Sequence, residues 1–231
     1  MPSFINLVQT PDAEDFLQRS RIPTGRKVML GDRERFQNMA SFNAISYAHS
    51  AIKEGADKIE ALTSDKTRNE PEKHAAARQV AEQVKDVLRR SMTTIDGEAR
   101  QLDREVDEIL AKRFNPSNYS QYSLSETVRW IREQAKKETG LLEIKKQAGL
   151  NNRVATVLYD LDDILLDLTP DVHQGFLEAS ISKLAPEAAT KIATSGQLRK
   201  LSANYAKAIT GVDRSYYMPA IANQVDTRVE V

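Results

Sequence analysis

The stretch LRRSMTTIDGEARQLDREVDEI, residues 88–109, decides the fold because its apolar residues repeat at helical spacing. The repeat alternates steps of four and three residues and consists of Leu88, Met92, Ile95, Ala99, Leu102, Val106 and Ile109. Arginines, aspartates and glutamates stand between these positions, as the solvated flanks of a coiled coil require. The spacing therefore predicts one long helix from about Pro71 to Phe114, with an apolar seam along one side.

A similar seam precedes this one in the chain. It steps by three and four residues through Phe42, Ile45, His49, Ile52, Ala56 and Ile59. The polar segment TSDKTRNEP (63–71) separates the two seams. Two helices joined by a short polar loop favour a long antiparallel hairpin over residues 32–114. The sequence leaves open whether the seams close within one chain or against a neighbouring chain.

Residues 115–211 are expected to form a smaller C-terminal helical bundle. The segment FNPSNYSQYS (114–123) is the strongest helix breaker in the chain and marks the boundary, and Ser123 with Glu126 forms a capping-box pattern. The expected helices run from Ser123 to Gly149 with an interruption at Gly140, and over about 152–168, 170–184 and 187–209. The last two begin with a proline in the first turn, where proline is well tolerated.

The two ends of the chain are interpreted as extended arms. Residues 1–31 comprise an arm and a short helix that begins at Thr10-Pro11 and is broken by RIPTG (21–25). Gly211 is expected to end the last helix, which leaves 212–231 as an extended tail. Short strands are expected only at 4–8, 26–30 and 227–231. The predicted class is all-α, with a long heptad-bearing hairpin, a C-terminal bundle and two arms.

One segment carries a catalytic-looking motif. The run VLYDLDDILLD (157–167) resembles the opening signature of the haloacid dehalogenase-type phosphatases, in which a buried strand leads into D-x-D-G-T-L-x-D. The resemblance implies a strand over 154–159, Asp160 as nucleophile, Asp162 as acid/base, and bound Mg²⁺. IATSG (192–196) resembles the second signature of that family, with Thr194 or Ser195 as the phosphate contact.

The residues around this motif favour a helix instead. Asp163 and Ile164 replace the glycine and threonine of the family pattern, and the segment that follows is too short for a parallel sheet with crossover helices. Apolar residues fall on one helical face, at Val154, Val157, Leu158, Leu161, Ile164, Leu165 and Leu168. We expect an amphipathic helix over 152–168 and keep the phosphatase as a remote alternative.

Other sequence features point to no catalytic or metal-binding residue. The chain has no cysteine, and its three histidines, His49, His74 and His173, show no ligand spacing. The carboxylates of 103–108 alternate with arginines and are interpreted as surface salt pairs. We therefore expect no catalytic residue, no metal, no cofactor and no small-molecule substrate.

The bulk composition limits the possible partners and locations. Lys plus Arg and Asp plus Glu both number 33, so the net charge is zero and a direct nucleic-acid ligand is not expected. No apolar run reaches the roughly 20 residues that span a bilayer. The N-terminal MPSFINLVQTPDAEDF lacks the pattern of a secretory signal. Synthesis in the cytoplasm without secretion or membrane contact is expected.

These observations lead to two functional hypotheses. The first is a structural or assembly protein that self-associates or packs with other subunits, in particular a neck, internal or scaffold-like component of a bacteriophage or virus particle. The second is a helical adaptor or regulatory module that binds a protein partner through an apolar groove. The residues expected to carry the contacts are Ile52, Ile59, Leu88, Ile95, Leu102, Ile109, Tyr216, Tyr217 and Met218. The tail residues among them could instead fold back onto their own bundle.

Overall fold

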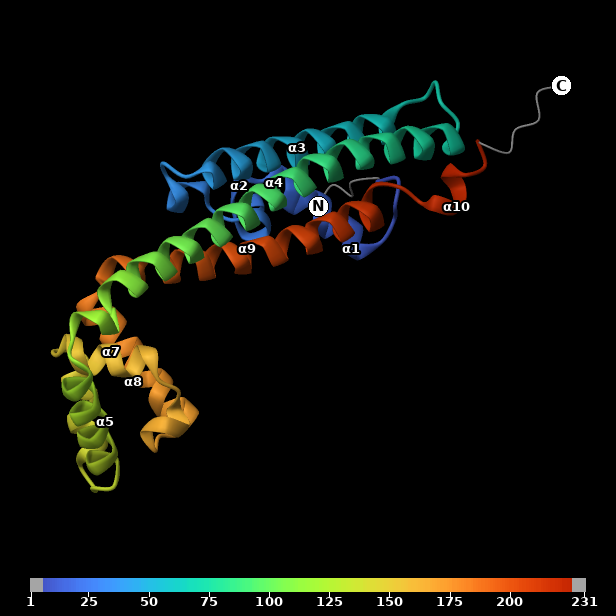
Figure 1. Cartoon of the computed structure of the whole chain (residues 1–231). Helices are drawn as coiled ribbons and strands as arrows, with labels where there is room; N and C mark the ends of the chain where they lie inside the picture. Colours follow the sequence, from blue (N-terminus) through green and yellow to red (C-terminus); the bar gives the residue numbers. More distant parts are fainter. Residues whose placement is uncertain (1–5, 226–231) are drawn as a thin grey trace. The chain divides into compact units, whose positions relative to one another are not determined.

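The computed structural model describes residues 6–225, and every regular element within that range is a helix. The predicted all-α class is therefore confirmed, and Figure 1 shows the helices along the chain. The strand expected at 26–30 is wrong, because these residues belong to helix α2 (Pro23–Leu30). Residues 6–8 form no strand, and the strand expected at 227–231 lies outside the described residues.

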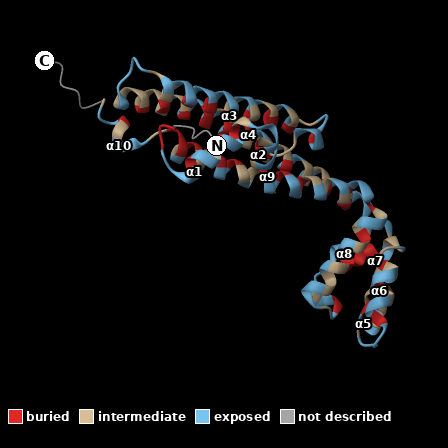
Figure 2. Ribbon diagram, turned by 180° about the vertical axis from the view of Figure 1, so that it is seen from behind, coloured by how far each residue is buried: buried red, intermediate tan, exposed pale blue. Residues whose placement is uncertain are grey.

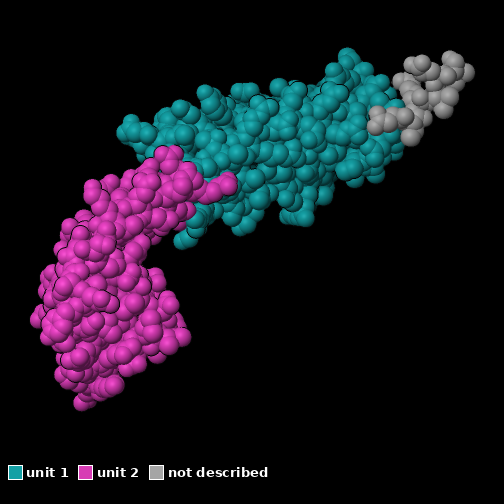
Figure 3. Space-filling model, viewed as in Figure 1, with its two compact units in different colours: residues 1–99, 197–231 teal, residues 100–196 magenta. Residues whose placement is uncertain are grey.

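The chain folds into two compact units, which Figure 3 distinguishes by colour. Unit 1 comprises Met1–Ala99 and Gln197–Val231, and unit 2 comprises Arg100–Gly196. The division falls inside α4 (Glu70–Arg113) and α9 (Pro186–Tyr216), so both helices contribute residues to both units. The units therefore differ from the four consecutive segments expected from the sequence (1–31, 32–114, 115–211 and 212–231), since the last segment returns to the unit that holds the first.

Prolines set the starts of the short helices in unit 1. α1 (Pro11–Arg21), α2 and α10 (Pro219–Ala222) each begin with proline, whose missing amide hydrogen is not needed in a first turn. The predicted start at Thr10-Pro11 is confirmed, because the Thr10 hydroxyl accepts a hydrogen bond from the Ala13 amide at 3.3 Å. The break expected at RIPTG (21–25) is a single residue, and Pro23 then begins a new helix.

The C-terminal part of unit 1 differs from the expected extended tail. α9 continues through Gly211 to Tyr216, and α10 follows within the tail expected over 212–231, so that expectation is wrong as far as Ala222. Residues 226–231 lie outside the described part of the chain. A Cβ atom at Gly211 would clash with the ring of Phe16. The glycine thus permits close packing of α1 on α9 and does not end the helix.

The longest helices of unit 1 are α3 (Ala40–Ser64), which follows the 3₁₀ turn η1 (Arg33–Phe36), and the first part of α4. They lie side by side and run in opposite directions (Figure 1). The Ser91 hydroxyl donates to the Ala44 carbonyl at 2.9 Å, and the Lys73 ammonium donates to the Thr63 carbonyl at 3.3 Å near the connecting loop. These two bonds fix the relative register of the helices.

A carboxylate on α4 caps the start of α3. Glu98 accepts hydrogen bonds from the backbone amides of Ala40 and Ser41 at 3.0 and 2.8 Å, and it also contacts the Ser41 hydroxyl. The first amides of a helix have no partner within the helix, so an acceptor from a neighbouring element satisfies them and favours the positive end of the helix dipole. The helix begins at Ala40, eight residues after the expected start near Asp32.

Unit 2 contains shorter helices around its own core. They are η2 (Pro116–Asn118), α5 (Gln121–Ala135), α6 (Gly140–Ala148), α7 (Asn152–Asp160), η3 (Asp163–Leu166) and α8 (Pro170–Leu184). The interruption expected at Gly140 is confirmed, since α5 and α6 are separate helices. The cap of α5 is Ser120, whose hydroxyl accepts from the Ser123 amide at 3.2 Å, so the expected start at Ser123 is displaced by three residues.

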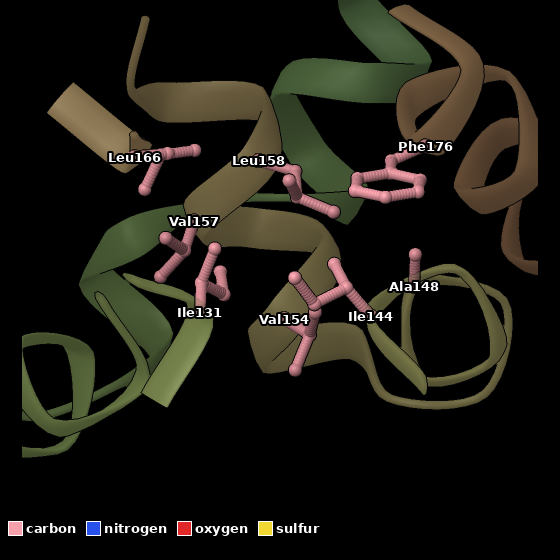
Figure 4. Packing of buried hydrophobic residues seen from close by; sticks show 8 residues of the cluster. All are labelled: Ile131, Ile144, Ala148, Val154, Val157, Leu158, Leu166 and Phe176. Carbon is pink, nitrogen blue, oxygen red and sulfur yellow. The ribbon is translucent and has the colours of Figure 1, made fainter. Parts of the chain in front are cut away.

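Aliphatic and aromatic side chains from α5, α6, α7, η3 and α8 meet in the core of unit 2. The buried members shown in Figure 4 are Ile131, Ile144, Ala148, Val154, Val157, Leu158, Leu166 and Phe176. α7 lies in the middle of this core, and each of its residues from Val154 to Leu158 is buried. A helix buried on all sides reads in sequence as a continuous apolar run, as a buried strand does.

This burial explains the phosphatase-like motif. The phosphatase alternative requires a strand over 154–159 that delivers Asp160, but these residues form α7 and Asp160 is its last residue. IATSG (192–196) likewise lies inside α9. The motif therefore occurs in a helical context, and its resemblance to the phosphatase signature comes from the buried run that precedes the aspartates.

The helix expected over 152–168 is correct only as far as Asp160. Leu161 is extended, η3 follows, and Asp167 has a φ of 58° in the left-handed region. This break shifts the phase of the apolar pattern. Leu166 is buried, whereas Ile164, which the helical pattern placed on the buried face, is 80% exposed.

Candidate protein-interaction surface

The apolar seam predicted from the heptad repeats lies largely inside the chain. Ile52, Ile59, Leu88 and Ile95 have no exposed surface, and all four belong to unit 1. We call this buried set of α3 and α4 side chains the inner seam. These side chains stabilise unit 1 itself, and a partner would have to unfold the helices to reach them.

Leu102 and Ile109 continue the α4 seam in unit 2 and are half-buried. Ile109 packs against a second apolar cluster that consists of Val106, Leu110, Phe114, Ala155, Ala185 and Ala188. The α4 seam therefore contributes side chains to the cores of both units, because α4 extends through both.

The tail residues expected to anchor a partner lie partly in the core of unit 1. Tyr216 is fully buried, its hydroxyl donates to the Ile52 carbonyl at 3.2 Å, and its ring meets Phe16 edge-on at 6.3 Å. A Cβ at Gly55 would lie 2.7 Å from the Tyr216 hydroxyl oxygen, so the glycine leaves room for the ring. Tyr217 is half-buried and Met218 is 43% exposed.

A buried histidine holds the segment that follows Tyr216. The amide of Met218 donates to Nδ1 of His74 at 3.0 Å, and Nε2 of His74 lies 3.9 Å from the Glu70 carboxylate. Burial lowers the pKa of His74, against the opposing effect of Glu70. Since Nδ1 accepts a hydrogen bond, the imidazole is neutral here and carries its proton on Nε2.

All three histidines contact backbone atoms and have structural roles. Nε2 of His49 lies 3.0 Å from the Gly31 carbonyl, and Nε2 of His173 lies 2.7 Å from the Leu158 carbonyl. Burial lowers the pKa of His49. Within residues 6–225, no group of three or more histidine, aspartate or glutamate side chains is placed to hold a metal ion.

The opposite side of the α3–α4 pair carries a surface feature that the heptad analysis missed. Three neighbouring hollows of about 560, 200 and 430 Å³ follow the junction of the two helices, and each shares lining residues with the next. The lining residues from α3 and its C-cap are Ala40, Asn43, Ala44, Tyr47, Ser50, Ala51, Glu54, Gly55, Lys58, Ala61, Leu62 and Asp65. The lining residues from α4 and the loop before it are Arg68, Ala76, Gln79, Val80, Gln83, Val84, Val87, Arg90, Ser91 and Thr94. We call this continuous surface the outer groove.

The composition of the outer groove differs from that of an ordinary solvated helix face. A subset of its residues steps by three and four along both helices, from Ala40 to Asp65 and from Ala76 to Thr94. Alanine, valine and tyrosine supply nine of the 22 lining residues, and polar or charged residues supply 11, so about half of the groove is apolar. Tyr47 is 67% exposed on this face, and Figure 2 shows that α3 is exposed on the side turned away from α9.

Five charged residues interrupt the lining, namely Glu54, Lys58, Asp65, Arg68 and Arg90. Glu54 and Lys58 stand one helical turn apart near the middle of the groove, and Asp65 and Arg90 stand toward its ends. The repeat of small residues at Ala40, Ala44, Ala51 and Ala61 is visible in the sequence and could have revealed this second stripe. The heptad analysis followed the large aliphatic residues and therefore described only the inner seam.

Unit 2 also exposes several large apolar side chains. Its most exposed large apolar side chains are Ile164, Tyr122, Leu142 and Leu150, which are 68–80% exposed. Arg132 donates to the Leu165 carbonyl at 2.7 Å and so ties the η3 turn to α5. The turn is thus a fixed element that presents Ile164 to solvent.

Comparison of the chain with known protein families, with curated proteins and with solved structures finds no match. Among the helices of residues 6–225, none combines the length and the apolar character that crossing a bilayer requires. The functional argument therefore rests on the surfaces of the two units.

Proposed function

We propose that this protein is a structural assembly subunit that packs through its helices against other protein chains and has no catalytic role. The observation that carries the proposal is the outer groove. A junction between two long helices that is lined by small apolar residues is the surface on which a further helix or helix pair packs. Large exposed apolar areas on soluble proteins mark such contact sites.

The proposed setting is a multi-chain particle, with a bacteriophage or virus component as the specific case. What supports a particle is that each unit exposes apolar side chains, in the outer groove of unit 1 and at residues such as Ile164 in unit 2. A subunit in an extended assembly has to make more than one kind of contact, and two separate surfaces provide for this. An adaptor that binds one partner helix needs only one of them.

Molar mass measured by size-exclusion chromatography with light scattering over a dilution series tests the assembly proposal. We expect a species well above the 25.9 kDa of one chain, which dissociates only on strong dilution. The matched variants are Val87→Asp in the outer groove, which should lower the mass, and Lys53→Asp outside the groove lining, which should not. A stable monomer at the highest concentration would contradict the assembly role and favour the adaptor.

A further inference from the structure

We infer that the outer groove is occupied by the outer groove of a second copy of this chain, with the two copies related by a two-fold axis perpendicular to α3. The inference rests on the proposed assembly function and names the partner. In this arrangement α3 packs on α3 of the second copy and α4 packs on α4, each pair running antiparallel. The result is a four-helix bundle formed by two helix pairs.

The charges in the middle of the groove are complementary to themselves under this rotation. Glu54 and Lys58 are separated by four residues, about 6 Å along the helix, and neither forms an ion pair within the part of the chain that the structure describes. A two-fold axis midway between them places Glu54 opposite Lys58 of the second copy, twice in each dimer. Opposite charges placed in this way fix the register of a helical interface.

The uncharged residues of α3 match under the same axis. A rotation that exchanges positions 54 and 58 also exchanges positions 51 and 61, so Ala51 meets Ala61 of the second copy and the helices can approach closely. It also exchanges positions 47 and 65. The exposed ring of Tyr47 then lies over the hollow beside Asp65 of the second copy, whose carboxylate can accept the tyrosine hydroxyl.

α4 gives an independent check on where the axis lies. Val80 and Val87 meet across an axis that passes midway between them, beside Val84. The α3 axis passes midway between Glu54 and Lys58, beside Gly55. Gly55 and Val84 are direct neighbours, since a Cβ at Gly55 would lie 2.6 Å from a Val84 methyl group. An axis that passes beside Gly55 and Val84 therefore pairs Val80 with Val87 on α4 as it pairs Glu54 with Lys58 on α3.

The size of the groove suits a stable dimer. The α3 lining from Ala40 to Asp65 extends over roughly 38 Å at 1.5 Å per residue, and two helices with axes 8–10 Å apart present a face about 20 Å wide. The face measures roughly 750 Å², close to the ~800 Å² that each partner contributes to a typical specific interface.

Charge exchange in the full-length chain tests the register. Glu54→Lys places two lysines opposite each other at both symmetry-related positions, and Lys58→Glu places two glutamates there. We expect each single variant to weaken dimerisation by about 10- to 30-fold, as measured by sedimentation velocity over a concentration series. The double variant E54K/K58E restores the opposite pairs, so its dimerisation should return to within about 3-fold of the original protein.

The control uses a second pair on the same helix. Lys53 and Asp57 form an ion pair at 2.7 Å and do not line the groove. Lys53→Asp and Asp57→Lys, singly and together, should leave dimerisation unchanged. Far-UV circular dichroism of every variant should show the same helix content, which separates a lost interface from a lost fold.

A cross-linking experiment distinguishes this axis from other packings. The chain has no cysteine, so Ala51→Cys and Ala61→Cys variants carry a single thiol each. A short bismaleimide should cross-link a mixture of the two variants into dimers far more efficiently than either variant alone. If the original protein is oligomeric but the double charge variant shows no rescue, or the mixture cross-links no better than its components, the inferred interface is wrong while the assembly function stands. A monomeric original protein contradicts both.

Discussion

The inner seam and the outer groove lie on the same two helices and share the same repeat of three and four residues, yet only one of them is covered. The inner seam has isoleucine and leucine at its centre, and these residues are fully buried. The outer groove has alanine, valine and isolated charges, and its residues are mostly half-buried or exposed. The same repeat therefore accompanies a covered face and an uncovered face, and the larger aliphatic side chains stand on the covered one.

The largest expected effect is a loss of stability, and it distinguishes the inner seam from the outer groove. Ile52→Asp places a charge at a position with no exposed surface, where a buried carboxylate has no partner. We expect the free energy of unfolding of unit 1 to fall by at least about 4 kcal/mol. Urea denaturation followed by circular dichroism measures the loss.

The neighbouring residue gives the control for this prediction. Lys53 is exposed and pairs only with Asp57 on the same helix, so Lys53→Ala should cost no more than about 0.5 kcal/mol. Equal urea midpoints for the Ile52 and Lys53 variants would mean that the inner seam is not the core of unit 1.

The second prediction concerns a lysine buried among the helices of unit 1. The Lys85 ammonium lies 2.6 Å from Asp213 on α9 and 2.7 Å from Glu82, and its side chain is 6% exposed. Burial lowers the pKa of Lys85, but the hydrogen bonds that its ammonium donates to Asp213 and Glu82 outweigh this effect and raise the pKa above its ordinary value. The lysine therefore stays charged and depends on its two carboxylates.

Removing a carboxylate should therefore cost more than removing the lysine. Asp213→Ala leaves a buried ammonium with one partner, and we expect a loss of about 1–3 kcal/mol. Lys85→Met leaves only carboxylates that are 42% and 51% exposed and can be hydrated, so it should change stability by no more than about 1 kcal/mol. Thermal denaturation at pH 7 gives both values, and the opposite order would show that the carboxylates are the desolvated partners.

The long helices also show how much of the secondary structure can be predicted from the sequence. Helix α4 was predicted within a residue or two at each end, because a 3.5-residue repeat of large aliphatic residues has few other interpretations. The α7–η3 segment was predicted less well, since a helix buried on all sides has no polar face to show where it ends. The outer groove was missed because alanine gives a weak signal when periodicity is judged from large side chains.

Contacts between residues distant in sequence were beyond prediction. Glu98 caps α3 from α4, and the pairing of Tyr216 with Ile52 joins positions 164 residues apart. No local pattern marks such partners. The return of the chain to unit 1 after Gly196 could not be predicted either, because it depends on contacts between distant residues.

The third prediction concerns pH. Burial lowers the pKa of His74 in the folded chain below its unfolded value of about 6.5, so the unfolded state binds more protons as the pH falls. Its stabilising contribution is complete above about pH 6.5 and is lost progressively as the pH falls below that value. Protonation of Nδ1 would also place a hydrogen against the Met218 amide, which is itself a donor.

Replacing His74 by asparagine separates the effect of this histidine on the pH dependence of stability from the effects of the other titrating groups. His74→Asn keeps an acceptor for the Met218 amide but does not titrate. Urea midpoints at pH 7.5 and 5.5 should therefore differ less in the variant than in the original protein, by up to about 1.4 kcal/mol in the free energy of unfolding. An unchanged pH dependence would assign the effect to His49, whose pKa is lowered by burial as well.

The smallest expected effect compares two buried tyrosines of α9. Tyr205 and Tyr216 both have no exposed surface, and burial raises the pKa of both phenols. The Tyr216 hydroxyl donates to the Ile52 carbonyl, whereas the Tyr205 hydroxyl has no hydrogen-bond partner among the residues that the structure describes. A buried hydroxyl without a partner destabilises a fold relative to an apolar group of the same shape.

Phenylalanine substitutions should therefore have opposite signs. Tyr216→Phe removes a hydrogen bond and should lower the free energy of unfolding by about 1 kcal/mol, while Tyr205→Phe should leave it unchanged or raise it by up to about 1 kcal/mol. Thermal denaturation of both variants at one pH measures the difference, and the two rings serve as controls for each other because the substitution is the same. A loss of stability in Tyr205→Phe equal to that in Tyr216→Phe would mean that the Tyr205 hydroxyl is satisfied in solution, and the inner side of α9 would then contain a bound water.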